Sequence, residues 1–266
     1  MKTVILAGGQ GTRLREETSF LPKPMIKIGD KPILWHIMSI YANQGFNDFI
    51  ICSGYKNEVI KNYFLNYKSL ENDFTVNLKS GNITIYNGDK NLDWNVTVVN
   101  TGEDTQTGGR IKRIKDFIEG ERFFATYGDG LANINLSNLL QSHGFNKHDS
   151  GCLATLTAAL NTSKFGEIEW ELINLDSDYS GRITSFEEKS KTNWINGGFF
   201  VFEKEVFDYI KGDNEPLEGG LLTTLTKLGL LGVYKHFGFW QCMDTYKEIL
   251  LLNKLYSNND IKWEQI

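Results

Sequence analysis

Residues 4–14 read VILAGGQGTRL, and residues 21–25 read LPKPM. A short apolar run thus ends in three glycines, and the cations Arg13 and Lys23 follow. Glycine lets the backbone approach a bulky anion and adopt positive φ. Backbone N–H groups in such a loop, with a helix start beyond them, attract anions. The stretch therefore predicts a triphosphate-binding loop, although an ordinary tight turn between a strand and a helix has similar glycines.

The residues around Lys23 support the phosphate-binding interpretation. Proline restricts its own φ and the conformation of the residue before it, so Pro22 and Pro24 make residues 21–25 a stiff, extended segment that presents Lys23 at a set position. The glycines lack the Gly-x-Gly-x-x-Gly spacing of the dinucleotide fold, and the Gly-Lys-Ser/Thr ending of a P-loop is missing. This spacing argues against a Rossmann dehydrogenase.

The composition is that of a globular protein with an acidic balance. The 266 residues are 41% apolar and 23% charged, with a net charge of −5, and they suffice for a substantial core. No apolar stretch has the length of a membrane span, residues 1–6 enter a strand without a secretory pattern, and no basic stripe suits nucleic acid. Three distant cysteines fit buried free thiols. We expect a cytoplasmic protein with no nucleic acid and no membrane as partner.

Strand patterns alternate with helical patterns along the chain. Strands are expected at residues 2–6, 48–53, 97–100, 123–127 and 153–158, and helices at residues 33–45, 57–64 and 110–117. Such alternation predicts an α/β fold with a mostly parallel central sheet and helices on both faces. Right-handed crossovers then place the loops after the strands along one edge, where ligands bind in such sheets.

Two segments are expected as additions within a single domain that spans residues 1–266. Residues 66–94 are too long for an ordinary connection, so we expect a lid, an arm or a subunit contact with β segments at 74–78 and 83–86. Residues 168–186 fit a β-hairpin with its turn at 178–181. A leucine-rich helix is expected at residues 246–266.

A carboxylate follows the strand expected at residues 123–127. Asp129, flanked by Gly128 and Gly130, comes where side chains point into the ligand crevice of such a sheet. Asp-Gly is also a common hairpin turn. As a hard oxygen donor, Asp129 is a candidate ligand for Mg²⁺.

Further stretches complete a longer pattern: GDKPILWHIM at 29–38, TGGR at 107–110, YGDG at 127–130, NGGFF at 196–200 and GFWQCMDT at 238–245. Together with residues 4–25 they resemble, over almost the full chain, the sugar-phosphate nucleotidyltransferases and most of all their cytidylyl branch. The resemblance implies a single Rossmann-like nucleotide-diphospho-sugar transferase domain. It also implies CTP and α-D-glucose 1-phosphate as substrates, CDP-glucose and pyrophosphate as products, Mg²⁺ as cofactor and a homo-oligomer, with a hexamer as one option.

The resemblance also assigns the nucleotide and metal sites. The nucleotide-binding residues would be Leu6, Ala7, Gly8, Gly9, Gly11, Thr12, Arg13, Lys23, Thr107, Gly109, Arg110, Tyr127, Gly128 and Asp129. Arg13 would screen the triphosphate, Lys23 would bridge the α-phosphate and the incoming sugar phosphate, and Arg110 would bind phosphate. Asp244 would hold Mg²⁺ with Asp129. Alternatively, Arg110 is a solvated residue of a helix that starts near Gly109, and Asp244 is a helix N-cap or a solvated loop acid.

The sugar side is assigned in the same way. Glu188 and Lys189 would bind the sugar hydroxyls and phosphate, with Asn196, Gly197 and Trp240 beside them. A Glu-Glu-Lys run also fits a solvated face, and Trp240 also fits a core position. The chain departs from the family at residues 215–222, where EPLEGGLL stands in place of a Glu-x-Glu-Pro-Leu stretch. Another sugar or alditol phosphate, and a catalytically silent nucleotide-binding homologue, therefore stay open.

Overall fold

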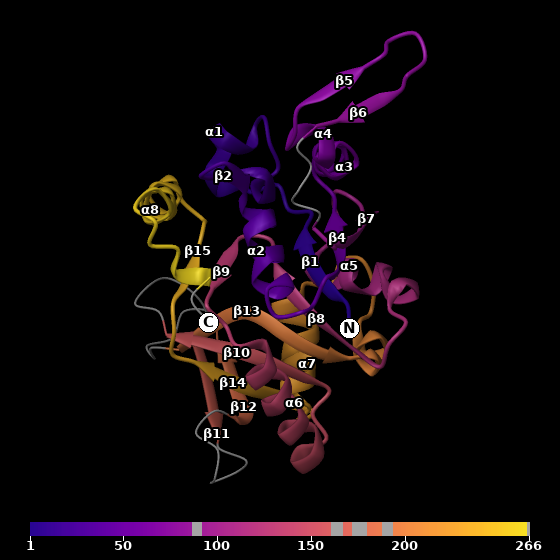
Figure 1. Cartoon of the computed structure of the whole chain (residues 1–266). Coiled ribbons are helices and arrows are strands. Elements are labelled where there is room, and N and C mark those ends of the chain that lie inside the picture. The colour runs from indigo at the N-terminus through magenta and orange to yellow at the C-terminus, as the bar shows by residue number, and fades with distance from the viewer. Residues whose placement is uncertain (87–91, 161–166, 172–179, 188–193, 265–266) are drawn as a thin grey trace.

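The computed structural model describes residues 1–86, 92–160, 167–171, 180–187 and 194–264. Its centre is a nine-stranded sheet with the strand order β10-β14-β12-β11-β13-β8-β1-β4-β7 (Figure 1). One half of this sheet is parallel: β1 (Thr3–Ala7) lies between β4 (Asp48–Ser53) and β8 (Arg122–Tyr127), and β7 (Asn95–Asn100) pairs with β4 at the edge.

The other half of the sheet is mixed. β13 (Trp194–Glu203) runs antiparallel to both β8 and β10 (Ala154–Leu160), whereas β14 (Leu231–His236) is parallel to β10. β11 (Glu167–Glu171) and β12 (Ser180–Glu187) pair antiparallel, as expected for the hairpin. Residues 178–179 of the predicted turn lie outside the described residues, and the prediction of a turn at residues 180–181 is wrong because both pair with β14 as part of β12. The predicted α/β class with a parallel centre is confirmed.

Both faces of the sheet are buried, and successive residues of one strand face opposite sides. Ile5 and Ala7 of β1 belong to one apolar core, and Val4 and Leu6 belong to the other. This alternation explains why the first strand is apolar at every position, as expected for a buried parallel strand. The predicted helices on both faces are therefore confirmed.

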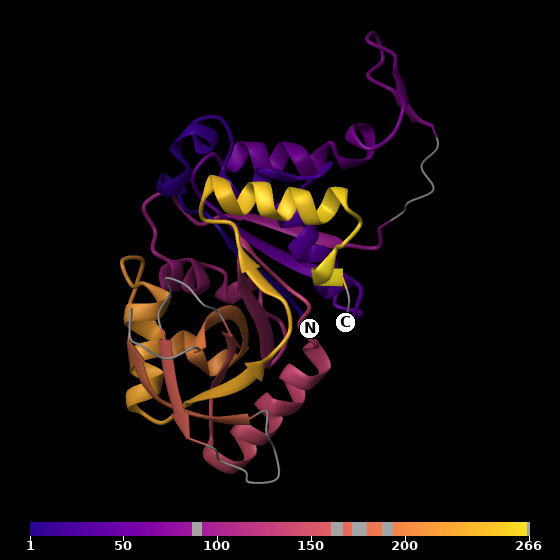
Figure 2. The ribbon, with the colours of Figure 1, turned by 90° about the vertical axis from the view of Figure 1, so that its left-hand side faces the viewer.

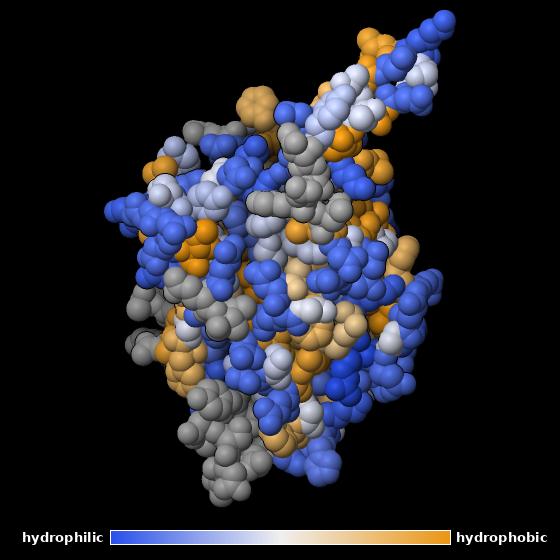
Figure 3. Space-filling view, in the orientation of Figure 1, coloured by the Kyte–Doolittle hydropathy of each residue, from blue (hydrophilic) through white to orange (hydrophobic). Residues whose placement is uncertain are grey.

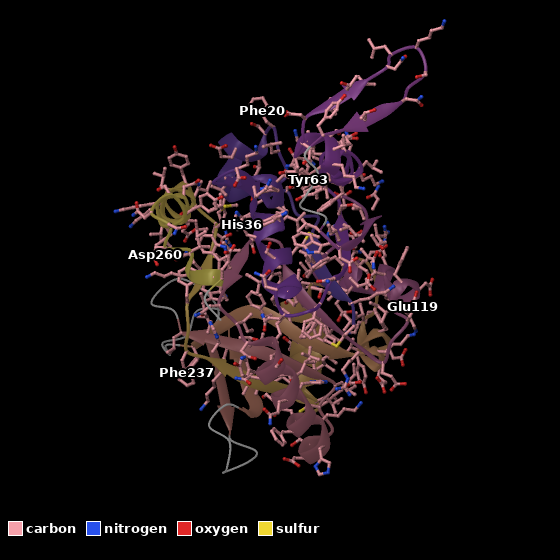
Figure 4. The ribbon with its side chains drawn as sticks, in the orientation of Figure 1. Phe20, His36, Tyr63, Glu119, Phe237 and Asp260 are labelled. Carbon is pink, nitrogen blue, oxygen red and sulfur yellow. The ribbon has the colours of Figure 1, made fainter. Side chains whose placement is uncertain are left out.

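One core is covered by α2 (Ile33–Ala42), α6 (Leu136–Ser150) and α8 (Tyr246–Ser257), and the other by α5 (Thr107–Arg113) and α7 (Thr223–Lys227). Figure 2 shows α8, in yellow, in the upper half of the molecule with the indigo N-terminal elements. His36 of α2 anchors the C-terminal segment, because its ring meets Tyr256 and Trp263 edge-on while Nε2 lies 2.9 Å from the carbonyl oxygen of Ile28 (Figure 4).

The segment predicted as an addition at residues 66–94 leaves the body of the protein. After α3 (Asn57–Leu65) and α4 (Tyr67–Leu70), β5 (Phe74–Val76) and β6 (Ile83–Ile85) form an antiparallel hairpin that projects from the sheet (Figures 1 and 2). We call residues 71–86 the arm.

Short elements complete the chain. They are α1 (Arg15–Thr18), the pairs β2 (Lys27–Ile28) with β3 (Lys31–Pro32) and β9 (Gly130–Ala132) with β15 (Trp240–Cys242), 3-10 turns at Thr12–Leu14, Lys23–Met25, Lys115–Phe117, Lys204–Tyr209 and Lys262–Glu264, and a π-helical turn at Leu217–Leu222. Cys52, Cys152 and Cys242 are buried thiols, as predicted. Among the described helices, none is both long and apolar enough to cross a bilayer.

Candidate active site

The loop after β1 has the geometry of an anion cradle. Gly11 has φ of +63°, which favours glycine, and a Cβ at Gly8 would overlap the guanidinium of Arg110. The carbonyl oxygen of Gly8 points inward and accepts the Tyr55 N–H at 3.1 Å. No described residue accepts a hydrogen bond from the N–H groups of Gly9, Gln10 or Gly11. The loop therefore presents free donors to a ligand.

A cavity of about 440 Å³ opens beside this loop. Eleven of the predicted nucleotide-binding residues line it: Leu6, Ala7, Gly8, Gly9, Gly11, Lys23, Thr107, Arg110, Tyr127, Gly128 and Asp129. The lining also contains Gln10, Pro24, Glu103, Asp104, Thr105 and Gln106, which sequence reasoning missed. The available signal was their position in the sequence: Gln10 lies in the glycine loop, Pro24 follows Lys23, and residues 103–106 directly precede α5. Thr12, Arg13 and Gly109 are not among the lining residues.

Four charged residues converge at the rim of the cavity. The ammonium Nζ of Lys23 donates to Asp129 Oδ2 and to Asp244 Oδ1, both at 2.5 Å. Arg13 Nη1 donates to Asp244 Oδ2 at 2.7 Å. The fold thus brings together the four residues that sequence reasoning chose, although as many as 231 positions separate them.

Strand pairing explains why the two carboxylates meet. Asp129 lies between β8 and β9, and Asp244 follows β15. β9 pairs with β15, so that Gly130 faces Cys242, and the N–H of Met243 donates to the carbonyl oxygen of Asp129 at 2.8 Å. Lys23 enters from the first 3-10 turn after Pro22, with the fixed backbone that the prolines predict.

Asp244 is not the N-cap of α8, which corrects the alternative weighed above. The cap is Thr245, which forms a reciprocal capping box with Glu248. Glu248 also accepts the backbone N–H of Asp244 at 2.7 Å. The carboxylate of Asp244 is therefore left to the two cations.

The ion cluster controls the charge of Lys23. Burial alone would lower the pKa of Lys23, but the adjacent carboxylates of Asp129 and Asp244 raise it above its ordinary value. Lys23 therefore stays protonated throughout the physiological range, in an orientation fixed before any ligand arrives.

Arg110 lies beneath the loops and is 3% exposed, so the prediction that it could be solvated is wrong. Nη1 donates to the carbonyl oxygens of Ser53 and Gly102 and to Thr101 Oγ1, and Nη2 donates to those of Gly8 and Glu103, at 2.6 to 3.3 Å. No described carboxylate pairs with this guanidinium, and burial lowers the pKa of Arg110. Its charge faces the cavity, and its hydrogen bonds fix both loops around it.

Gly108 and Gly109 fit a close approach between segments. A Cβ at either position would lie within 2.7 Å of a carbonyl oxygen of Glu215 or Asp213, and the N–H of Gly109 donates to Glu215 O at 3.1 Å. The helix begins at Thr107, two residues before the predicted start. The lack of a side chain at these glycines therefore allows α5 to pack closely against residues 213–216.

The sugar-side residues that the structure describes lie next to Tyr127. Asn196 Nδ2 is 3.4 Å from the hydroxyl of Tyr127, and Trp240 Nε1 donates to the carbonyl oxygen of Gly197 at 2.7 Å. Trp240 is half-buried and packs against the core that contains Ile5 and Ala7. Glu188 and Lys189 lie outside the described residues. At the departure from the family pattern, a Cβ at Gly220 would overlap the side chain of Glu215, whose Oε2 accepts the Lys211 N–H at 2.5 Å.

Comparisons with known proteins identify the family of the chain. The model of the family described as nucleotidyl transferase matches residues 2–226. The chain is 44% identical over 266 residues to a probable glucose-1-phosphate cytidylyltransferase of Bacillus subtilis, and 42% identical over 268 residues to the glucose-1-phosphate cytidylyltransferase of Salmonella typhi. Each alignment covers 99% of both chains.

Solved structures share the fold at low identity. HddC from Yersinia pseudotuberculosis aligns with a TM-score of 0.74 at 22% identity, over 96% of this chain and 99% of its own. A UDP-glucose pyrophosphorylase in complex with UDP-glucose aligns with a TM-score of 0.73 at 19% identity, over 97% and 98%. With the family match and the full-length relatives, these comparisons place the chain in the nucleotidyl transferase family.

Proposed function

We propose that this protein is a glucose-1-phosphate cytidylyltransferase, which joins CTP and α-D-glucose 1-phosphate to give CDP-glucose and pyrophosphate. The observation that carries this proposal is the convergence of Lys23 on Asp129 and Asp244 at the rim of a glycine-lined cavity. The full-length relatives at 42–44% identity support the choice of nucleotide and sugar.

The reaction is an in-line displacement at phosphorus. A phosphate oxygen of the sugar phosphate attacks the α-phosphorus of CTP, a new P–O bond forms, and the bond to pyrophosphate breaks. The attacking oxygen is already ionised, so the enzyme needs no covalent nucleophile. Catalysis then consists of positioning and charge stabilisation.

Lys23 and Arg13 supply the fixed positive charge in this proposal. Lys23 lines the cavity and is held by two carboxylates, so its ammonium needs little reorganisation to donate to the α-phosphate or to the incoming sugar phosphate. Arg13, whose side chain is 71% exposed although Nη1 pairs with Asp244, is placed to meet the outer phosphates. The N–H groups of the glycine loop bind the remaining oxygens.

The donor set fits Mg²⁺, which prefers carboxylate oxygens. The oxygens of Asp129 and Asp244 already converge on one cationic group, the ammonium of Lys23. Mg²⁺ sites commonly use one or two protein carboxylates and substrate phosphates. When bound, Mg²⁺ would neutralise phosphate charge. Asp129 and Asp244 would hold it.

We further propose a homo-oligomer with the arm as a subunit contact. Phe74, Ile83 and Leu78 are exposed on the arm, Leu78 to 91%. An apolar groove of about 780 Å³ lies at the root of the arm between α3, α4, β6 and β7. Figure 3 shows hydrophobic residues along this arm. An isolated two-stranded hairpin is marginally stable in water, so a second copy of the chain is its expected partner.

The test is a matrix of nucleoside triphosphates against sugar 1-phosphates and alditol phosphates, with Mg²⁺ and pyrophosphate release as the readout. Release with CTP and glucose 1-phosphate above all other pairs is expected. Preference for another acceptor would keep the chemistry and overturn the sugar. No release with any pair, despite nucleotide binding, would support a silent binding homologue.

A further inference from the structure

A carboxylate behind the cavity connects its two sides. Glu218 stands in the π-helical turn Leu217–Leu222, which starts after Pro216 and leads into α7. π-helical turns are rare and are frequent at functional sites. Glu218 is partly buried and is not among the residues that line the cavity.

Each oxygen of this carboxylate contacts a different wall. Oε1 accepts the hydroxyl of Tyr127, which ends β8 two residues before Asp129. Oε2 accepts the hydroxyl of Thr107 at 3.3 Å, at the first residue of α5. The same Thr107 oxygen accepts the N–H of Leu217 at 2.7 Å. Thr107 and Tyr127 both line the cavity.

Tyr127 extends the connection to the sugar side. Its hydroxyl accepts from Asn196 Nδ2, and Asn196 Oδ1 accepts the N–H of Gly198 at 2.9 Å. Gly198 has φ of +76°, and a Cβ there would lie 2.5 Å from the ring of Tyr127. Burial, and then the charge of Glu218, raises the pKa of Tyr127, so the phenol remains a donor.

We propose that Glu218 is a positioning residue that couples the nucleotide wall at Thr107 to the sugar side at Asn196 through the phenol of Tyr127. Charged hydrogen bonds are stronger than neutral ones. A single carboxylate shared by both walls therefore fixes the distance between them. The inference rests on the proposed function for its kinetic readout, whereas the hydrogen bonds themselves do not depend on it.

The test compares three variants of the full chain. Glu218→Ala removes both bonds and is expected to raise KM for CTP about tenfold and lower kcat about tenfold, in line with the loss of orientation. Glu218→Gln keeps the shape and an acceptor for Tyr127, and should restore both constants to within about threefold. Thr223→Val is the matched control, because it removes only the bond from Thr223 Oγ1 to the backbone oxygen of Glu218, at 2.9 Å.

Coupling distinguishes positioning from simple stability. If Glu218 acts through the phenol, Tyr127→Phe and Glu218→Ala together cost less than the product of their separate effects. Changes in Tm that match the Thr223→Val control, with kcat and KM unchanged, would overturn the proposal. Calorimetric binding of Mg²⁺–CTP to the same variants keeps the test independent of turnover. A Glu218→Ala chain that binds CTP like the parent would also contradict the inference, whereas a parent without transferase activity would contradict only the proposed function.

Discussion

The rim of the cavity and the arm differ in how their side chains are held. At the rim, Lys23, Asp129, Asp244 and Arg13 are tied to one another from distant parts of the chain. On the arm, the apolar side chains of Phe74, Leu78 and Ile83 face solvent. The contacts of the rim thus form within one chain, whereas the arm offers apolar surface to the second copy proposed above.

The largest effect is expected at Lys23. Lys23→Met removes a preorganised charge and leaves two carboxylates facing each other, so kcat should fall about 10³-fold. Pyrophosphate release under saturating substrates measures the loss. Lys115→Met is the control, because Lys115 is half-exposed and 3.6 Å from Asp208; it should keep parent activity. A Lys23→Met enzyme within tenfold of the parent would contradict the assigned role.

Arg110 should show the next largest effect. Arg110→Lys cannot reach five acceptors in two loops, so KM for CTP should rise about 10²-fold and the free energy of unfolding should fall by about 2–3 kcal/mol. Arg113→Lys is the matched control on the same helix. Arg113 pairs with exposed Asp213 at 2.7 and 2.8 Å, a kind of pair that contributes little, and makes a single bond to the loop, from Nη1 to the carbonyl oxygen of Thr101 at 3.0 Å. Equal effects of the two substitutions would argue against Arg110 as the organiser of the loops.

Substitutions on the arm should change assembly and leave turnover nearly unchanged. The triple variant Phe74→Ser, Leu78→Ser, Ile83→Ser removes apolar surface from the arm and leaves the rim unchanged. The oligomer proposed above should therefore dissociate, while kcat per chain changes by less than about twofold. Sedimentation velocity measures the assembly, and Lys79→Ser on the same hairpin serves as the control. An unchanged mass with the triple variant would remove the arm from the interface.

The smallest effect concerns stability at a third location. His143 of α6 lies 2.9 Å from Glu203 Oε1 and 2.9 Å from Thr155 Oγ1, and Arg122 and Lys147 also face Glu203. Burial lowers the pKa of His143. Burial alone would raise the pKa of Glu203, but hydrogen bonds from His143 and Lys147 lower it.

Both shifts act in the same direction. The folded state binds these protons less readily than the unfolded state, so the free energy of unfolding should decrease as the pH falls from about 6.5 towards about 4. Denaturant titrations at several pH values measure the slope. His143→Gln should make the free energy of unfolding less dependent on pH near pH 6.5. His148→Gln, at an exposed position, should leave this dependence unchanged. Equal slopes in both variants would exclude His143 as a source of the decline.

The sequence predicts those elements whose signal lies in neighbouring residues. The glycine loop, the prolines around Lys23 and the carboxylate after β8 follow from short-range rules of backbone conformation and sheet topology. The helix α6 was missed, because Ser142, His143 and Asn146 are buried on it and weaken the apolar periodicity. β13 was recognised only as a motif, since a strand buried on both faces does not alternate.

The contacts of Arg110 and Glu218 could not be read from the sequence. Arg110 finds its acceptors in two loops and at the end of β4, and Glu218 contacts residues that are 91 and 111 positions away in the chain. Local patterns hold no information on such pairs, so the same Arg110 was compatible with phosphate binding and with solvent. Asp244 was chosen from the family pattern, and the pairing of β9 with β15 explains why it lies beside Asp129.

The most direct test of the central claim is a crystal structure of the protein soaked with CTP and Mg²⁺. We expect the triphosphate to accept hydrogen bonds from the N–H groups of Gly9 to Gly11, and Lys23 Nζ to lie within about 3 Å of an α-phosphate oxygen. A nucleotide bound elsewhere, or Lys23 directed away from it, would contradict the account.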